Sequence, residues 1–331
     1  MIFSRNLLRA GGFLSLTAAA TAQNSSYVLA DSYDTSTFFD GFEFFTGPDP
    51  TSGFVDYVDA STANATGLAG YANNGIYLGV DYQTANPPKG RQSVRLSTRK
   101  SYTRGLIIAD IAHQPAQACG AWPAFWTVGP NWPHSGEIDI IEGVNMQETS
   151  AITLHTGSGC KFSKASWSAK DCGSPGDASQ GCGKSSQDHR TYGAKFNEIG
   201  GGVYAVQWTS NAINVFFFPR SGSIPADLQA GSPDPSKWGT PLASFSGGSC
   251  DIDSFFSNHQ IVFDTTFCGQ WAGTVWNQDA VCAAKAPTCQ EYVAKNPADF
   301  QEAYWLINYV KVFNEAGVAK KQRAFAKQFI A

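Results

Sequence analysis

The stretch Gly136-Glu137-Ile138-Asp139-Ile140-Ile141-Glu142-Gly143 places three acidic residues in one short β-prone segment. Side chains alternate between the two faces of a strand, so Glu137 and Asp139 share one face and the isoleucine between them faces away. Continued alternation would turn Glu142 toward the apolar face, where an unpaired carboxylate is costly. A β-bulge at Ile140-Ile141 would add one residue and return Glu142 to the face of the other acids. We therefore expect a bulged strand with three carboxyls on one side.

Short β-prone segments recur on both sides of this stretch, separated by Gly, Pro, Asn, Asp and Ser. This pattern is typical of an antiparallel β-sandwich. The expected strands are 75–82, 93–96, 105–111, 124–128, 137–142, 151–155, 203–209, 213–218, 260–263 and 305–313. Only Cys289–Lys295 and the tail beyond Asn314 have a helical pattern. The Gly-, Ser- and Pro-rich stretches 158–188 and 219–248 are expected to be long loops.

The N-terminus has the features of an export signal. Arg5 and Arg9 precede an apolar stretch too short to span a bilayer, and Ala20-Thr21-Ala22 matches the small-x-small cleavage pattern. We expect a signal peptide over 1–22, one β-sandwich domain over 23–314 and a basic C-terminal tail over 315–331. The protein is therefore expected to be secreted and extracellular, without a membrane anchor.

Composition and cysteine content agree with export. The 331 residues carry a formal net charge of only −4, which gives no indication of a nucleic-acid partner. All eight cysteines follow the signal, and an even number in an exported chain predicts a disulfide framework whose pairing the sequence leaves open. A zinc site is the weaker alternative, because no CxxC pair occurs. Asn24 and Asn64 begin glycosylation sequons.

Three neighbouring carboxyls suit glycosidic bond cleavage. Retaining glycosidases hold two carboxyls about 5 Å apart, one as nucleophile and one as general acid and then base. The bulge separates the Cα atoms of Glu137 and Glu142 by ~13 Å, which long side chains and sheet curvature can shorten. Mutual repulsion, with Asp139 between them, should raise at least one pKa and keep an acid protonated. A solvated acidic edge strand or a calcium ligand set is the alternative.

The segments around the acids resemble those of glycoside hydrolase family 16, especially the fungal endo-1,3(4)-β-glucanases or laminarinases. The resemblance extends over most of the chain after the signal. It rests on the segments 120–133 (GAWPAFWTVGPNWP), 136–143 (GEIDIIEG), 39–50 (FDGFEFFTGPDP), 154–156 (LHT), 267–273 (FCGQWAG) and 303–312 (AYWLINYVKV). It implies an all-β jelly-roll sandwich of two curved antiparallel sheets, concanavalin-like, with a substrate cleft on the concave face.

The resemblance also implies roles for individual residues. It makes Glu137 the nucleophile, Glu142 the acid/base and Asp139 the residue that assists the nucleophile. His155 is implied to lie beside the acid/base, and three tryptophans are implied to line sugar subsites. They are Trp126, Trp132 and Trp271.

Without the resemblance, the sequence supports a binding role for some of these residues better than for others. Trp132, between Asn131 and Pro133, is costly to expose unless it stacks on something, and sugar rings offer apolar faces. Trp126 follows Phe125 in a strand, so one of the two faces the core. Without the resemblance, His155 is expected to be a buried histidine with its hydrogen bonds made. Structural positions are expected for five further tryptophans, Trp122, Trp208, Trp238, Trp276 and Trp305.

The sequence thus predicts a secreted, monomeric, retaining endo-β-glucanase that needs no cofactor or metal and acts on a β-glucan polysaccharide. A transglycosylase with the same acids and a non-catalytic lectin on the same scaffold are the alternatives. The preference among β-1,3, mixed β-1,3/1,4 and branched chains stays open.

Overall fold

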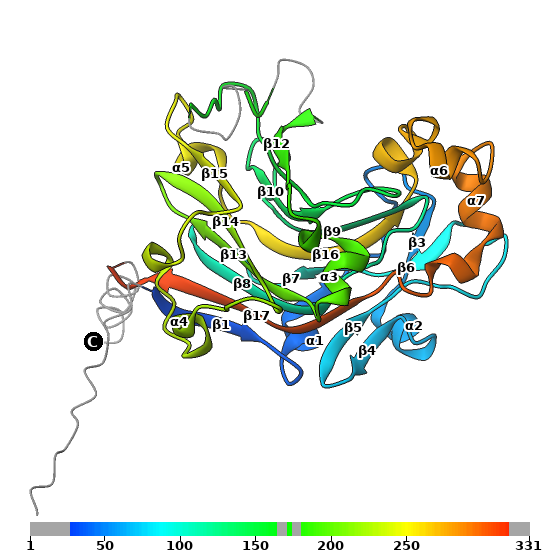
Figure 1. Cartoon of the computed structure of the whole chain (residues 1–331), viewed down its shortest axis with the longest axis horizontal. Coiled ribbons are helices and arrows are strands. Elements are labelled where there is room, and N and C mark those ends of the chain that lie inside the picture. Colours follow the sequence, from blue (N-terminus) through cyan, green and yellow to red (C-terminus); the bar gives the residue numbers. More distant parts are fainter. Residues whose placement is uncertain (1–26, 164–170, 174–179, 318–331) are drawn as a thin grey trace, which may run out of the picture.

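The computed structural model describes residues 27–163, 171–173 and 180–317. The proposed signal peptide, the Asn24 sequon and most of the basic tail lie outside these residues. Two large antiparallel sheets make up most of the fold, as predicted, and Figure 1 shows them as stacked, curved layers.

One sheet carries the acidic strand near its middle. Its order is β12 (Cys182–Ser185), β11 (Ala151–His155), β10 (Glu137–Glu142), β9 (Ala121–Val128), β16 (Gln260–Phe267), β7 (Arg95–Thr98) and β2 (Phe42–Phe44).

The second sheet has eight strands. Its order is β15 (Ala243–Ser246), β14 (Ala212–Pro219), β13 (Gly202–Trp208), β8 (Gly105–His113), β17 (Trp305–Glu315), β5 (Gly75–Leu78) and β4 (Ala69–Ala72), and β1 (Tyr27–Tyr33) also pairs with β17. A short parallel pair joins β3 (Val55–Tyr57) to β6 (Arg91–Ser93).

Short helices lie in the connections between strands. The α-helices are α1 (Phe38–Gly41), α2 (Ala60–Ala65), α3 (Gly193–Glu198), α4 (Ala226–Gln229), α5 (Ile252–Phe255), α6 (Ala280–Ala283) and α7 (Cys289–Lys295). The tighter or wider turns are η2 (His189–Thr191), η3 (Pro235–Lys237), η4 (Gly269–Gly273), η5 (Trp276–Gln278) and η6 (Pro297–Phe300), of which η4 is a π-helical turn.

The main core fills the space between the two sheets. The isoleucines of β10 are fully buried there. Phe125 of β9 stacks on Phe263 of β16 at 4.4 Å, and Phe263 meets Trp305 edge-on at 5.5 Å. One face of the seven-stranded sheet is therefore committed to packing, and the other is free to carry polar chemistry.

The sequence-based prediction of elements was wrong in several places. The expected strand 93–96 is split, because Ser93 ends β6 and Arg95 begins β7. The expected loop 158–188 contains β12, and 219–248 contains α4 and β15. Strands this short give little periodic signal and depend on a neighbouring strand for their hydrogen bonds. Helix α7 has the predicted bounds.

The predicted disulfide framework is confirmed, and all eight cysteines are paired. The bonds join Cys119 to Cys282, Cys160 to Cys250, Cys172 to Cys182, and Cys268 to Cys289. Two of them begin in the predicted loop 158–188, so that segment is cross-linked.

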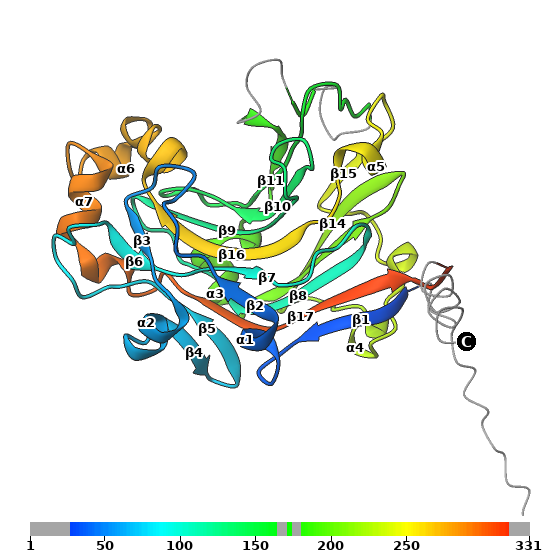
Figure 2. The same ribbon diagram turned by 180° about the vertical axis from the view of Figure 1, so that it is seen from behind.

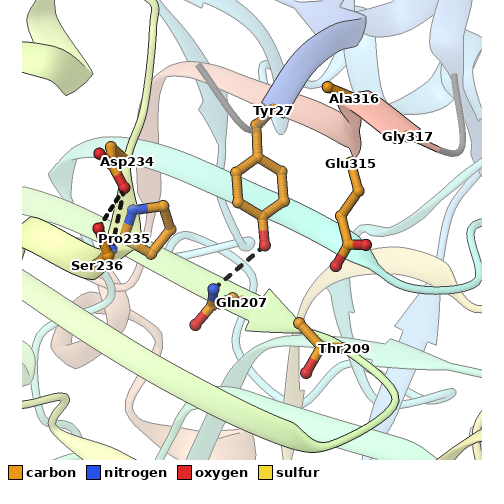
Figure 3. A pocket seen from close by; sticks show the side chains of 9 residues that line it. All are labelled: Tyr27, Gln207, Thr209, Asp234, Pro235, Ser236, Glu315, Ala316 and Gly317. Atoms are coloured by element: carbon orange, nitrogen blue, oxygen red, sulfur yellow. Dashed lines mark hydrogen bonds between the residues drawn. The ribbon is translucent and has the colours of Figure 1, made fainter. Parts of the chain in front are cut away.

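A cavity of about 380 Å³ lies on the outer face of the eight-stranded sheet, away from the acids. Tyr27, Gln207 and Glu315 are among its lining residues, and Figure 3 shows the hydrogen bond from Gln207 Nε2 to the Tyr27 hydroxyl, 3.2 Å long. Figure 2 shows β1 beside β17 near this end of the molecule.

No helix in the described part of the chain is both long and apolar enough to cross a membrane.

Candidate active site

The register of β10 shows how three acids reach one face. Against β9, Glu137 pairs with Val128, Asp139 with Trp126 and Glu142 with Ala124, and the register shifts between Asp139 and Ile141. The three β9 partners are two residues apart and share a face, so the three acids share it too. The register against β11 shifts between Asp139 and Glu142 as well. The predicted bulge at Ile140-Ile141 is confirmed.

His155 lies beside Glu137 and Asp139. It is the β11 residue paired with Glu137, and its Nε2 lies 3.2 Å from Asp139 Oδ2 and 3.7 Å from Glu137 Oε1. His155 and Asp139 are buried. The resemblance implied that this histidine lies beside Glu142. Its contacts of 3.2 and 3.7 Å are with Asp139 and Glu137, and its charge also acts on Glu142.

Burial and repulsion raise the pKa of both glutamates. Burial first, and then the charge of Asp139, raises the pKa of Glu137 to about 8, while the His155 charge opposes the shift. The same two causes raise the pKa of Glu142 well above its ordinary value. The charge of Asp139 therefore disfavours ionisation of both glutamates. At neutral pH the cluster therefore retains protons that exposed carboxyls would release.

These observations bear on the two alternatives for the acids. Strand β10 lies inside the sheet between β9 and β11, so it is not a solvated edge. Glu137, Asp139 and His155 do place ligand atoms within 4.8 Å of one another, which a metal ion could use. Calcium takes oxygen ligands, however, and a set that includes an imidazole nitrogen does not suit it.

Trp122 does not pack in the core, in contrast to the prediction. It is only partly buried, and its Nε1 donates a 2.9 Å hydrogen bond to Glu142 Oε1. Its ring meets Trp271 edge-on at 5.6 Å. Alternation along β9 places Trp122 on the face of Trp126, and this signal could have identified it. The structural positions predicted for the other four tryptophans are confirmed, since Trp208, Trp238, Trp276 and Trp305 are all buried.

The hydrogen bond from Trp122 stabilises ionised Glu142 and opposes the rise in the pKa of this acid. We expect Trp122→Phe to reduce kcat/KM about tenfold, the typical cost of losing a hydrogen bond to a charged group. The alkaline limb of the pH profile should move to higher pH, because Glu142 would hold its proton more tightly. Steady-state rates against pH measure both effects. An unchanged alkaline limb would mean that the indole does not act on Glu142.

Trp126 faces the acids, and Phe125 faces the core. The Trp126 Nε1 donates to Asp264 Oδ1 at 3.2 Å, and the Arg95 guanidinium lies 4.9 Å from the Trp126 ring centroid. The Tyr57 hydroxyl donates to the other oxygen of Asp264 at 3.2 Å. Burial raises the pKa of Asp264 to about 6, and Arg95 opposes the rise. The sequence did not predict Arg95, Asp264 and Tyr57 as site residues, and they come from three separate strands.

Trp132 lies in the β9–β10 hairpin and is 48% exposed. A hydrogen bond from its side chain lowers the pKa of Glu137, which places the indole at the site. The hairpin is held by the buried His259, which the sequence did not predict either. Its Nε2 lies 2.8 Å from the Ser135 carbonyl oxygen and its Nδ1 lies 2.8 Å from Thr127 Oγ1.

Burial lowers the pKa of His259 to about 4. The folded-state pKa lies below the unfolded value of about 6.5, so the unfolded chain takes up this proton first. The free energy of unfolding is therefore highest above pH 6.5 and decreases as pH falls toward 4. We expect His259→Gln to make this decrease smaller by about 2 kcal/mol. Urea unfolding between pH 4 and 7 measures it, and parallel curves for the two proteins would contradict the prediction.

Comparisons with known proteins place this geometry in a family. A family model described as "XgeA-like, catalytic GH16 domain" matches residues 42–313. An endo-1,3(4)-beta-glucanase of Arthroderma benhamiae is 45% identical over 323 residues, covering 95% of this chain and 70% of the relative. A probable endo-1,3(4)-beta-glucanase of Aspergillus fumigatus is 42% identical over 344 residues. That alignment covers all of this chain but 52% of the relative, so the chain spans about half its length.

Solved structures agree with this assignment. An elongating family 16 β-1,3-glucosyltransferase is 44% identical with a TM-score of 0.79, covering 87% of this chain and 100% of that one. Laminarinase 16A of Phanerochaete chrysosporium, solved with β-glucans in its donor and acceptor sites, is 39% identical with a TM-score of 0.80. The match covers 87% of this chain and 99% of the laminarinase chain. The bulged acidic strand, the two curved sheets and the family match agree, and this chain belongs to glycoside hydrolase family 16.

Proposed function

We propose that this protein is a secreted endo-β-glucanase that hydrolyses internal β-1,3 and mixed β-1,3/1,4 linkages with retention of configuration. The observation that carries the proposal is the shared face of Glu137 and Glu142 on bulged β10, with the charge of Asp139 acting on both.

The proposed reaction is a double displacement. Glu137 attacks the anomeric carbon while Glu142 protonates the departing oxygen, and Glu142 then removes a proton from the water that releases the sugar. The raised pKa of Glu142 keeps its proton available near neutral pH. Glu137 must be ionised to attack. Burial and the charge of Asp139 disfavour that form and raise its pKa to about 8, and the His155 charge near its Oε1 opposes them. These steps call on no cofactor.

Aromatic side chains supply flat surfaces for the sugar rings. Trp126, Trp132 and Trp271 are assigned this role, and Trp122 joins them through its contact with Trp271. Each is at least partly accessible, while the core tryptophans are buried. Indole rings cover the apolar CH faces of sugars well, which suits a neutral polysaccharide.

The β-glucan assignment is supported by the relatives named endo-1,3(4)-beta-glucanase and by the laminarinase solved with glucans. Secretion is supported by the four disulfides, which persist in oxidising compartments. Action as a monomer and the domain boundaries at residues 23 and 314 stay predictions.

Transglycosylation is the second candidate function. It is favoured by the 44% identity to an elongating β-1,3-glucosyltransferase that this chain covers completely. The same glutamates would serve, with a sugar hydroxyl in place of water in the second step.

The test is incubation of the purified protein with laminarin, lichenan, cellulose, agarose and xyloglucan, followed by product sizing. Proton NMR of the first products gives the anomeric configuration. Shortened laminarin chains with β-anomers support a retaining endo-glucanase, and α-anomers would contradict retention. Products longer than a laminari-oligosaccharide substrate would favour transglycosylation. Binding without cleavage of any glucan would indicate a lectin.

A further inference from the structure

Three segments around Glu142 meet at the side chain of Asn145, three residues beyond this acid. Asn145 Oδ1 accepts a 2.8 Å hydrogen bond from the Gly120 N–H, and its Nδ2 donates a 3.0 Å bond to the Ala272 carbonyl. Gly120 lies two residues before Trp122, and Ala272 follows Trp271 directly. A single amide thus joins the end of β10 to the segments that carry both tryptophans.

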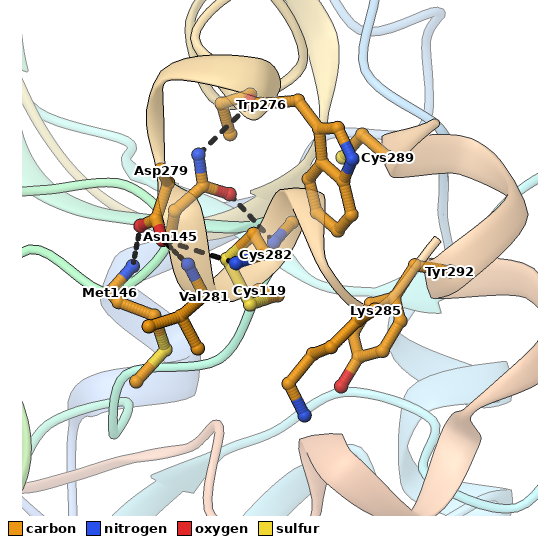
Figure 4. Close-up of a disulfide and its surroundings, with 12 residues drawn as sticks. Cys119, Asn145, Met146, Trp276, Asp279, Val281, Cys282, Lys285, Cys289 and Tyr292 are labelled. Carbon is orange, nitrogen blue, oxygen red and sulfur yellow. Dashed lines mark hydrogen bonds between the residues drawn. A yellow bond between two sulfur atoms is a disulfide. The ribbon is translucent and has the colours of Figure 1, made fainter. Parts of the chain in front are cut away.

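Asn145 is built into this position. Asn145 is only 3% exposed, and its backbone N–H donates to the Ala121 carbonyl at 3.1 Å. Its φ is +54°, a left-handed conformation that asparagine tolerates better than most residues. Figure 4 shows Asn145 close to the Cys119–Cys282 disulfide, with the Asp279 carboxylate accepting from the backbone N–H of Met146, 3.1 Å away.

A contact chain connects this amide to the acid. Trp271 meets Trp122 edge-on, and Trp122 donates to Glu142 Oε1. Trp271 lies in the π-helical turn η4, where backbone hydrogen bonding is irregular. The bond to Ala272 adds a side-chain tether to a turn whose own backbone closes through the 2.9 Å hydrogen bond from the Gly273 N–H to the Cys268 carbonyl.

We propose that Asn145 is a positioning residue that holds the Trp271 turn against Trp122 and thereby orients both the indole beside Glu142 and the sugar surface of Trp271. This inference rests on the proposed function for its kinetic effect, because the effect requires Glu142 to act on a glucan. Its structural part, the tether on Trp271, stands independently.

The test combines Asn145 variants with Trp271→Ala. Asn145→Gly keeps the left-handed backbone and removes both side-chain bonds. Asn145→Asp keeps an acceptor for Gly120 but places an acceptor against the Ala272 carbonyl, which breaks only the bond toward Trp271. Asn74→Gly is the matched control, since Asn74 also has positive φ (+61°) but is exposed in the β4–β5 turn.

We expect Asn145→Gly and Asn145→Asp to lower kcat/KM on laminarihexaose about 10- to 100-fold, the scale of a small displacement at a site. Asn74→Gly should match the parent. In the Trp271→Ala background, either Asn145 change should cost less than about twofold more, because residues acting through one contact are not additive. Full multiplication of the two losses, or parental kinetics for Asn145→Asp, would overturn the proposal.

Acrylamide quenching of tryptophan fluorescence separates this inference from the proposed function. Both Asn145 variants should increase the quenchable fraction, and the increase should be absent in the Trp271→Ala background. If the parent cleaves no glucan but quenching behaves as expected, the glucanase proposal fails and the tether stands. If the parent cleaves laminarin and quenching is unchanged, the tether fails and the glucanase proposal stands.

Discussion

Glu137→Gln and Glu142→Gln are each expected to reduce laminarin hydrolysis by about 10³-fold or more, since each removes one half of the double displacement. The two variants should differ on an aryl β-glucoside with a good leaving group. Such a substrate needs no protonation, so Glu142→Gln should still release the aryl group in a first turnover while Glu137→Gln should not. Rapid-quench measurement of released phenol distinguishes the two roles.

A matched control for these variants is Glu148→Gln. Glu148 lies six residues after Glu142 but is exposed, and its contact is an ion pair with the exposed His189. This variant should retain the parent's rate on both substrates. Undiminished laminarin hydrolysis by Glu137→Gln or Glu142→Gln would refute the catalytic assignment.

The loss of activity should come without a loss of stability. The folded-state pKa of Glu137 is about 8, above its ordinary value, so the folded protein binds this proton more tightly than the unfolded chain does. Stability therefore falls as pH rises from about 4.5 toward 8, and Gln removes this slope. We expect Glu137→Gln to raise the free energy of unfolding at pH 7 by about 1–3 kcal/mol, after allowance for coupling to Asp139. Urea titration of parent and variant provides the measurement.

Removal of the Cys119–Cys282 disulfide is expected to give the largest loss of stability. Its cysteines are 163 residues apart in sequence, so the bond restricts about half of the unfolded chain of 331 residues. The chain-entropy relation gives ~5 kcal/mol for a loop of this size, as an upper value for Cys119→Ser combined with Cys282→Ser. Urea unfolding without reductant measures the loss.

The Cys172–Cys182 bond is the matched control, because it closes a separation of only 10 residues. The same relation gives ~3 kcal/mol for its removal. The double serine variant at Cys172 and Cys182 should therefore unfold at a higher urea concentration than the variant at Cys119 and Cys282. The reverse order would show that local packing, and not loop length, governs these bonds.

The sequence alone was sufficient for features that depend on near neighbours. Period-two alternation assigned Glu137 and Asp139 to one face, and the cost of burying Glu142 required a bulge in the same six residues. The helical pattern of Cys289–Lys295 likewise gave α7 its bounds. In each case the interactions that decide the structure lie within one element, so the local residue types and their spacing are enough to predict it.

Only the tertiary structure decided which distant residues meet. The trio of Asp264, Arg95 and Trp126 comes from three strands that are neighbours in the sheet but far apart in sequence. The pairing of the cysteines and the hydrogen bond from Trp122 to Glu142 also depend on strand order and on packing at the sheet end. A local pattern shows which way a side chain faces, but its partner is set by the chain segment that folding brings alongside.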